Sequence, residues 1–130
     1  MKTTFPILKP FLDALERKKN AAHKIGGYTL LRSKPGCQKQ ADHKDYFVLK
    51  KKGKMSGDNA PHVGLIALEN DTTMHVEGEK VSVPKGSCII MRGNVVHAGS
   101  DYKVDNIRFH FYMDTPDYEA SGGTHTLWSE

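Results

Sequence analysis

The chain has 130 residues and a formal net charge of +4, with 38% hydrophobic and 26% charged residues. This composition is typical of a soluble domain with one core and excludes a disordered or collagen-like chain. No apolar run is long enough for a membrane span or a signal-peptide core, so we expect a cytoplasmic protein whose residues 1–130 form a single domain. Cys37 and Cys88 are far apart and form no C-x-x-C motif, which predicts reduced thiols and neither a disulfide framework nor a zinc cluster.

The first segment is expected to be helical. Apolar residues recur at helical spacing over residues 5–19, and Pro6 suits the first turn of a helix. Gly26 and Gly27 end this region. We therefore predict one N-terminal helix over residues 5–19.

The pattern then changes to short apolar runs separated by turn residues. The runs with about the length of a strand are YTLLRS, DYFVL, HVGLIALE, TTMHVE, GEKVSV, SCIIM, VVHAG, SDYKVD and NIRFHFYM. Closely spaced strands with turn signals favour an all-β sandwich or barrel over alternating strands and helices. We place this core at residues 28–114.

Two polar segments flank or interrupt the core. KKKGKMSGDNAP, at residues 50–61, has the composition of a basic connecting loop, and it is either a plain connection or a lid beside a site. Residues 115–130 are expected to be an irregular tail, which Trp128 pins back onto the domain.

The stretch ADHKDYF contains a candidate pair of metal ligands, His43 and Asp45. In an extended chain, residues two apart point to the same side, so these two side chains would aim at one metal ion. A facial iron site needs two His and one carboxylate. The third ligand must come from another strand, where His75 and His97 are the candidates; His97 precedes a small-residue turn, Ala98-Gly99, which leaves room for a cavity.

The run NIRFHFYMD alternates between two kinds of side chain. Arg108, His110 and Tyr112 form a polar face, and the residues between them form an apolar face. Apolar residues usually face the inside of a barrel, which would leave Arg108 in water. In the alternative arrangement the polar face lines a wet pocket, and the guanidinium of Arg108 binds a carboxylate.

The sequence resembles the Fe(II)/2-oxoglutarate-dependent oxygenases in the order and spacing of four residues: His43-x-Asp45, then His97, then Arg108. Arg108 follows His97 by 11 residues. The resemblance is to the phytanoyl-CoA dioxygenase-like branch, and it covers residues 28–114. It implies a double-stranded β-helix, a jelly-roll and cupin-like barrel. Members of the family are commonly longer, with helices that support the sheet, so a homodimer is the expected source of a missing pocket wall.

The resemblance also implies a role for each matching residue. His43, Asp45 and His97 would bind Fe(II), and Arg108 would bind the far carboxylate of the co-substrate 2-oxoglutarate. Gln40 and Tyr46 would contact the co-substrate or metal-bound water. The implied activity is hydroxylation of a substrate that the sequence does not identify, with succinate and CO2 as co-products.

The first alternative is a cupin-type metal enzyme, either an isomerase or a dioxygenase that does not use 2-oxoglutarate. GEKVSVPKG fits the start of the second cupin motif, but Ile89 stands where that motif needs a His. His75-x-Glu77 lies too close to His97 to serve as the first cupin motif.

The second alternative is a non-catalytic β-helix binding domain, in which the His and Asp residues are incidental. Nucleic-acid binding has little support, because the lysine-rich residues 50–54 accompany no recognised motif. A hydrolase is also disfavoured, since neither cysteine lies in a nucleophile signature.

Overall fold

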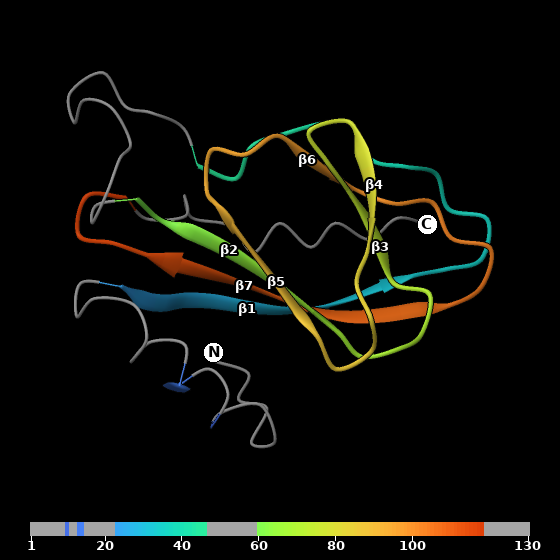
Figure 1. Cartoon of the computed structure of the whole chain (residues 1–130), viewed down its shortest axis with the longest axis horizontal. Coiled ribbons are helices and arrows are strands. Elements are labelled where there is room, and N and C mark those ends of the chain that lie inside the picture. Colours follow the sequence, from blue (N-terminus) through green and yellow to red (C-terminus); the bar gives the residue numbers. More distant parts are fainter. Residues whose placement is uncertain (1–9, 11–12, 15–22, 47–59, 119–130) are drawn as a thin grey trace.

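The computed structural model describes residues 10, 13–14, 23–46 and 60–118 and consists mainly of β-strands (Figure 1). Seven strands follow one another along the described chain: β1 (Lys24–Ser33), β2 (His62–Ala67), β3 (Thr73–Val76), β4 (Glu79–Ser82), β5 (Cys88–Arg92), β6 (His97–Gly99) and β7 (Asn106–Asp114). Each of them overlaps a run predicted to be extended, but β1 starts at Lys24, before the predicted core, and includes Gly26 and Gly27. The run SDYKVD forms a loop instead, in which only Tyr102 makes an isolated bridge, to Cys37.

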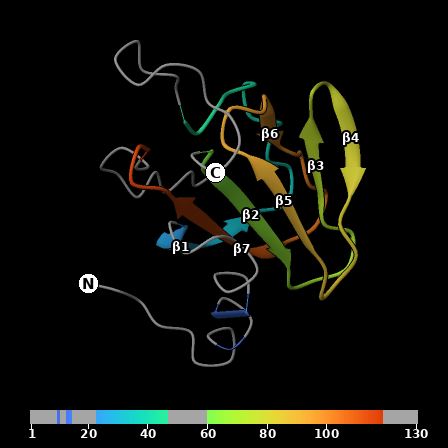
Figure 2. The ribbon, with the colours of Figure 1, turned by 60° about the vertical axis from the view of Figure 1, so that its left-hand side comes forward.

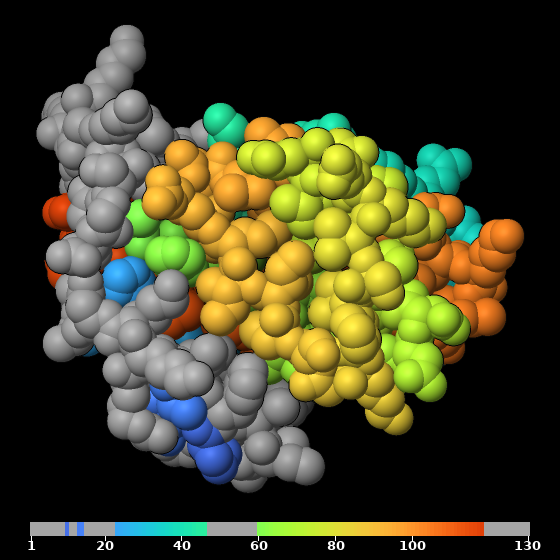
Figure 3. All heavy atoms as spheres, in the orientation of Figure 1, coloured from blue at the N-terminus to red at the C-terminus, as the bar shows by residue number. Residues whose placement is uncertain are grey.

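The strands form two antiparallel sheets. The larger sheet has the order β1-β7-β2-β5, and the smaller has the order β4-β3-β6. Figure 2 shows β3 and β4 standing to one side of the larger sheet, with β6 beside them. In the space-filling view, side chains of the β3–β5 region form much of the face toward the viewer (Figure 3). A pocket between the two sheets is lined by residues of both, among them Leu65 of β2 and Met74 of β3.

The prediction of a closed barrel is wrong, because no continuous ladder joins the two sheets of the described chain. After β1 the chain turns at Gly36, whose φ of 84° suits glycine, and it then runs beside β6 as the crossing segment (residues 34–46). This segment pairs with β6 only at separate points: Gln40 N donates to Gly99 O, and His43 and His97 exchange two backbone hydrogen bonds. Isolated pairs of this kind hold the segment in place but form no strand.

β7 lies in the middle of the larger sheet and presents two different faces. On one face Phe109, Phe111 and Met113 are fully buried and pack with Ile66. Gly64 on the neighbouring β2 allows this packing, since a Cβ there would lie 2.0 Å from the Phe111 ring. The opposite face of β7 carries the polar side chains, which point into the space between the sheets.

Several expectations concern residues outside the described part. The predicted helix 5–19 lies there except for Pro10, Asp13 and Ala14, which have helical conformation, so no helix of ordinary length is among the described elements. The basic loop over residues 50–61 lies outside except for its last two residues, as does most of the tail with Trp128. Among the described residues, no helix has the length and apolarity needed to span a membrane.

Candidate metal centre

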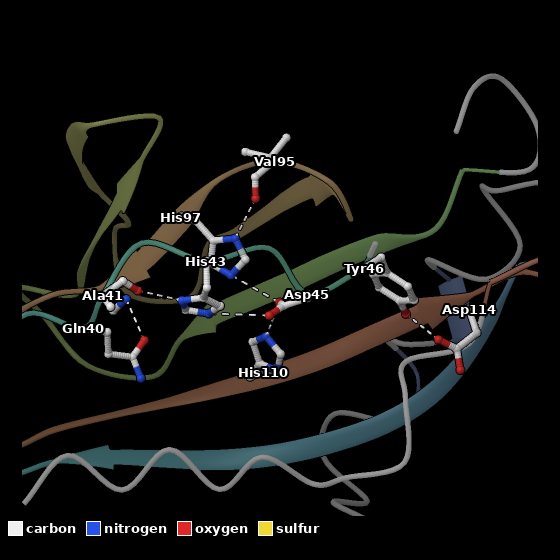
Figure 4. A network of polar contacts seen from close by, with 10 residues as sticks. Gln40, Ala41, His43, Asp45, Tyr46, Val95, His97, His110 and Asp114 are labelled. Carbon is white, nitrogen blue, oxygen red and sulfur yellow. Dashed lines mark hydrogen bonds and ion pairs between the residues drawn. The ribbon is translucent and has the colours of Figure 1, made fainter. Parts of the chain in front are cut away.

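Three side chains from two separate parts of the chain converge at one point. His43 and Asp45 belong to the crossing segment, and His97 is the first residue of β6. One ligand atom from each lies within 4.8 Å of the others, and Figure 4 shows the three groups turned toward one another. His97 is buried, while His43 and Asp45 are partly buried. The structure thus brings together the two-residue motif and the distant His that the sequence singled out.

The backbone fixes the orientation of both imidazole rings. Nδ1 of His43 lies 2.9 Å from the Ala41 carbonyl oxygen, and Nδ1 of His97 lies 3.0 Å from that of Val95 (Figure 4). A carbonyl only accepts hydrogen bonds, so Nδ1 must carry the proton in each neutral ring. Nε2 is then left with a lone pair, and both Nε2 atoms face Asp45. This arrangement is the usual one for His residues that bind a metal through Nε2.

The carboxylate of Asp45 completes a set of three acceptors. His43 Nε2 lies 3.5 Å from Asp45 Oδ1, and His97 Nε2 lies 3.2 Å from Asp45 Oδ2. Neighbouring ligand atoms in an octahedral site with bonds of about 2.1 Å are about 3.0 Å apart, so these spacings suit one small divalent cation. Asp45 Oδ2 is also buried, and its nearest polar neighbours are the Nε2 atoms of His97 and His110, so this ionised oxygen needs a cation, either a metal ion or an imidazolium. The donor set therefore fits a metal ion.

The pKa values of Asp45 and His97 also reflect this convergence. Burial raises the pKa of Asp45, but His110 and His97 lower it by more, so that carboxyl is held well below its ordinary pKa. Burial lowers the pKa of His97, and Asp45 raises it by more. Asp45 thus favours the protonated form of His97, and His97 in turn favours the ionised form of Asp45. A proton and a metal ion compete for the same nitrogen.

Arg108 lies in the same cavity and is only 6% exposed. Its Nη2 donates to Ser33 Oγ at 3.0 Å, and its guanidinium lies 5.0 Å from the centre of the Tyr102 ring. Within the described chain no carboxylate pairs with Arg108, and burial lowers the pKa of this guanidinium. A buried cation that faces a cavity without a counter-ion is suited to bind an anionic ligand. The arrangement in which the polar face of β7 lines a pocket is thus the one observed.

The cavity joins the metal centre to Arg108. Its volume, including the open mouth, is about 490 Å³. Its lining combines the polar groups of the metal centre and Arg108 with the apolar side chains of Leu31, Leu65 and Met74. A small molecule with one anionic group and one metal-binding group matches this distribution.

The remaining predicted residues lie in different places. Gln40 lines the cavity, but its Oε1 already accepts a hydrogen bond from Gly99 N at 2.9 Å. Tyr46 is not among the cavity residues, and its hydroxyl donates to Asp114. His75 lies on β3 opposite Ala98 and outside the cavity lining, so His97 is the one of the two candidates that reaches the centre.

Two cavity residues received no individual role from the sequence. His110 places Nε2 3.7 Å from Asp45 Oδ2, and its ring packs edge-on against Tyr112, with 4.8 Å between the ring centres. The signal for both was the alternation in NIRFHFYMD, which put them on the same face as Arg108. Ile89, which stands where the second cupin motif needs a His, packs with the apolar cluster of Leu65 and Met91.

Comparison with known proteins gives structural likeness only. The chain matches no protein-family model and no curated protein. The structure of a non-heme monooxygenase, ThoJ in complex with nickel, aligns with 87% of this chain at a TM-score of 0.58 and 17% identity. This chain covers 53% of the length of ThoJ. At this identity the likeness shows a shared fold.

Two other solved structures align more loosely. A cupin protein from Bacteroides fragilis has a TM-score of 0.45 and 12% identity, covering 77% of this chain and 73% of its own. A protein from Neisseria meningitidis has a TM-score of 0.48 and 15% identity, covering 86% of this chain and all of its own. None of the three descriptions names 2-oxoglutarate, so membership of that oxygenase superfamily stays a prediction.

Proposed function

We propose that this protein is a non-heme oxygenase that uses Fe(II) and 2-oxoglutarate to hydroxylate a substrate, with succinate and CO2 as co-products. The observation that carries the proposal is the convergence of three lone-pair donors, from His43, Asp45 and His97, in a cavity that Arg108 also lines, with no carboxylate partner among the described residues. The monooxygenase description of ThoJ, whose fold this chain shares, agrees with an oxidative reaction.

Each residue has a defined task in this proposal. The two imidazoles and the carboxylate would hold Fe(II), which would supply the chemistry of oxygen activation. Arg108 holds the far carboxylate of 2-oxoglutarate and so aims its oxo-acid end at the three ligands. Leu31, Leu65 and Met74 exclude water along the chain of the co-substrate.

A cupin-type metal enzyme that does not use 2-oxoglutarate is the second candidate. His110 favours it, because a fourth ligand at 3.7 Å from Asp45 would leave too few open positions for a chelating oxo acid and oxygen. The two candidates therefore differ in whether the oxo acid changes the spectrum of the bound metal.

The test is an anaerobic titration of the metal-free protein with Fe(II) and then with 2-oxoglutarate, following bound iron and visible absorption. We expect one iron per chain and a weak visible charge-transfer band when the oxo acid is added. His43→Ala should lose both, and His75→Ala, a His on β3 outside the cavity, should keep both. Iron binding without the band would favour the second candidate, and no iron binding would refute both.

A further inference from the structure

A row of aromatic rings leads away from the metal centre. His110 lies beside Asp45, and its ring packs edge-on against Tyr112 on the same strand. Tyr112 in turn packs edge-on against Tyr46, with 6.0 Å between ring centres. Edge-to-face contacts at these distances are within the usual range for interacting aromatic pairs. The three rings form an unbroken path from the cavity into the interior.

Tyr46 ends this path at a carboxylate. It is 3% exposed and packs with Ala60, Val63 and Tyr118 in an apolar cluster. Its hydroxyl donates a hydrogen bond to Asp114, the last residue of β7, and the Tyr46 phenol points away from the metal centre in Figure 4. A buried phenol bonded to a carboxylate can pass its proton along that bond when it loses an electron.

We propose that Tyr46 is a redox-active tyrosine that takes up oxidising equivalents from the metal centre through Tyr112. This role rests on metal binding at His43, Asp45 and His97 but not on the identity of the co-substrate. Tyr112 faces the cavity, and within the described chain its hydroxyl bonds to no carboxylate. Tyr46 has such an acceptor in Asp114, so the radical is more stable on Tyr46 than on Tyr112.

Oxidation of Tyr46 moves one electron and one proton in different directions. The electron leaves the Tyr46 ring and passes by way of Tyr112 toward His43, Asp45 and His97, where bound iron would supply the one-electron oxidant with oxygen or peroxide as its source. The phenolic O–H bond breaks, and its proton moves to the carboxylate of Asp114. The products are a neutral phenoxyl radical, a protonated Asp114 and a centre reduced by one electron. A small thiol then supplies one electron and releases its own proton to water, Asp114 returns the phenolic proton to Tyr46, and the thiyl radicals from two such reductions couple to a disulfide.

The benefit of the relay arises when no substrate is bound. An oxidant left in the cavity would attack the side chains nearest to it, which are the metal ligands and His110. A tyrosine outside the cavity removes the oxidant while the ligands stay intact. Tyr46 therefore protects the centre during unproductive turnover.

The experiment uses the full chain loaded with Fe(II), with bound iron measured first and no 2-oxoglutarate present. The protein is mixed with hydrogen peroxide, frozen, and examined by electron paramagnetic resonance for a tyrosyl signal. We expect a signal in the wild type, its loss in Tyr46→Phe and a lower yield in Tyr112→Phe. Tyr28→Phe is the matched control, because Tyr28 stacks on Phe109 in the apolar cluster on the other face of the sheet.

Oxidative damage gives a second readout that a purely structural role would not change. After repeated peroxide exposure, mass spectrometry should show more oxidised His43 and His97 in Tyr46→Phe than in the wild type or Tyr28→Phe. A full tyrosyl signal in iron-loaded Tyr46→Phe, or no signal in the iron-loaded wild type, would overturn the proposal. Iron that ignores 2-oxoglutarate but yields the signal would refute the proposed co-substrate alone.

Discussion

Replacing Arg108 with methionine should weaken 2-oxoglutarate binding strongly while leaving iron binding intact. The substitution keeps the length and packing of the side chain but removes the guanidinium. Arg108 lines the cavity, contacts Ser33 and Tyr102, and is not one of the three metal ligands. The expected loss therefore concerns the carboxylate of the co-substrate alone.

The structure sets the size of the effect. Arg108 is only 6% exposed, so a carboxylate bound to it is largely removed from water. Removing one partner of a buried, hydrogen-bonded charge pair costs about 3 kcal/mol, which corresponds to a loss of affinity of about 100-fold. The fold should persist, because the protein loses the bonds from Arg108 to Ser33 and Asn106 and its contact with the Tyr102 ring, about 1 kcal/mol each, but no longer buries a cation.

Isothermal calorimetry of the iron-loaded protein under anaerobic conditions measures this affinity directly. Arg32→Met is the matched control, since Arg32 is an exposed arginine on the same sheet that pairs with Asp105 at 2.8 Å. It should bind 2-oxoglutarate as the wild type does. Unchanged affinity in Arg108→Met, with one iron per chain, would show that the carboxylate binds elsewhere.

Three further outcomes are expected. His97→Ala should abolish retention of iron after gel filtration, and near-normal retention would remove His97 from the site. Iron affinity should fall as the pH is lowered through the pKa of His97, which Asp45 holds above its ordinary value despite burial. The fall should reach about tenfold per pH unit, because one proton is displaced by the metal. A pH-independent affinity between pH 6 and 8, a range taken around the ordinary His pKa, would contradict this competition. Gly64→Ala should lower the free energy of unfolding by about 2 kcal/mol, because its Cβ would overlap the buried Phe111 ring. Gly27→Ala is the control. Its Cβ would lie 3.8 Å from its nearest neighbour, so the melting temperature should change little.

The strands were predictable because their signals are local. β7 shows this most clearly, since the alternation in NIRFHFYMD by itself separates Phe109 and Phe111 from Arg108 and His110. The sequence could not say which of the two faces lies between the sheets. The general preference for apolar interiors would have placed Arg108 in water, and the opposite is observed.

The failure of barrel closure has a physical reason as well. Closure needs a continuous ladder between the two sheets, and whether one forms depends on the path of residues 34–46. The turn at Gly36 and the single contacts of Gln40 and His43 replace that ladder. Hydrogen bonds between segments far apart in the chain leave no periodic pattern in either segment.

The candidate site, too, was only partly predictable from the sequence. The sequence alone determined that His43 and Asp45 stand two residues apart, so that one short segment offers two ligands, and that His97 and Arg108 follow in a workable order. Only the tertiary structure decided that His97 rather than His75 meets them, that His110 lies beside Asp45, and that Tyr46 turns toward Asp114. Spacing along a chain fixes which side chains share a face, but packing between two sheets fixes which faces meet.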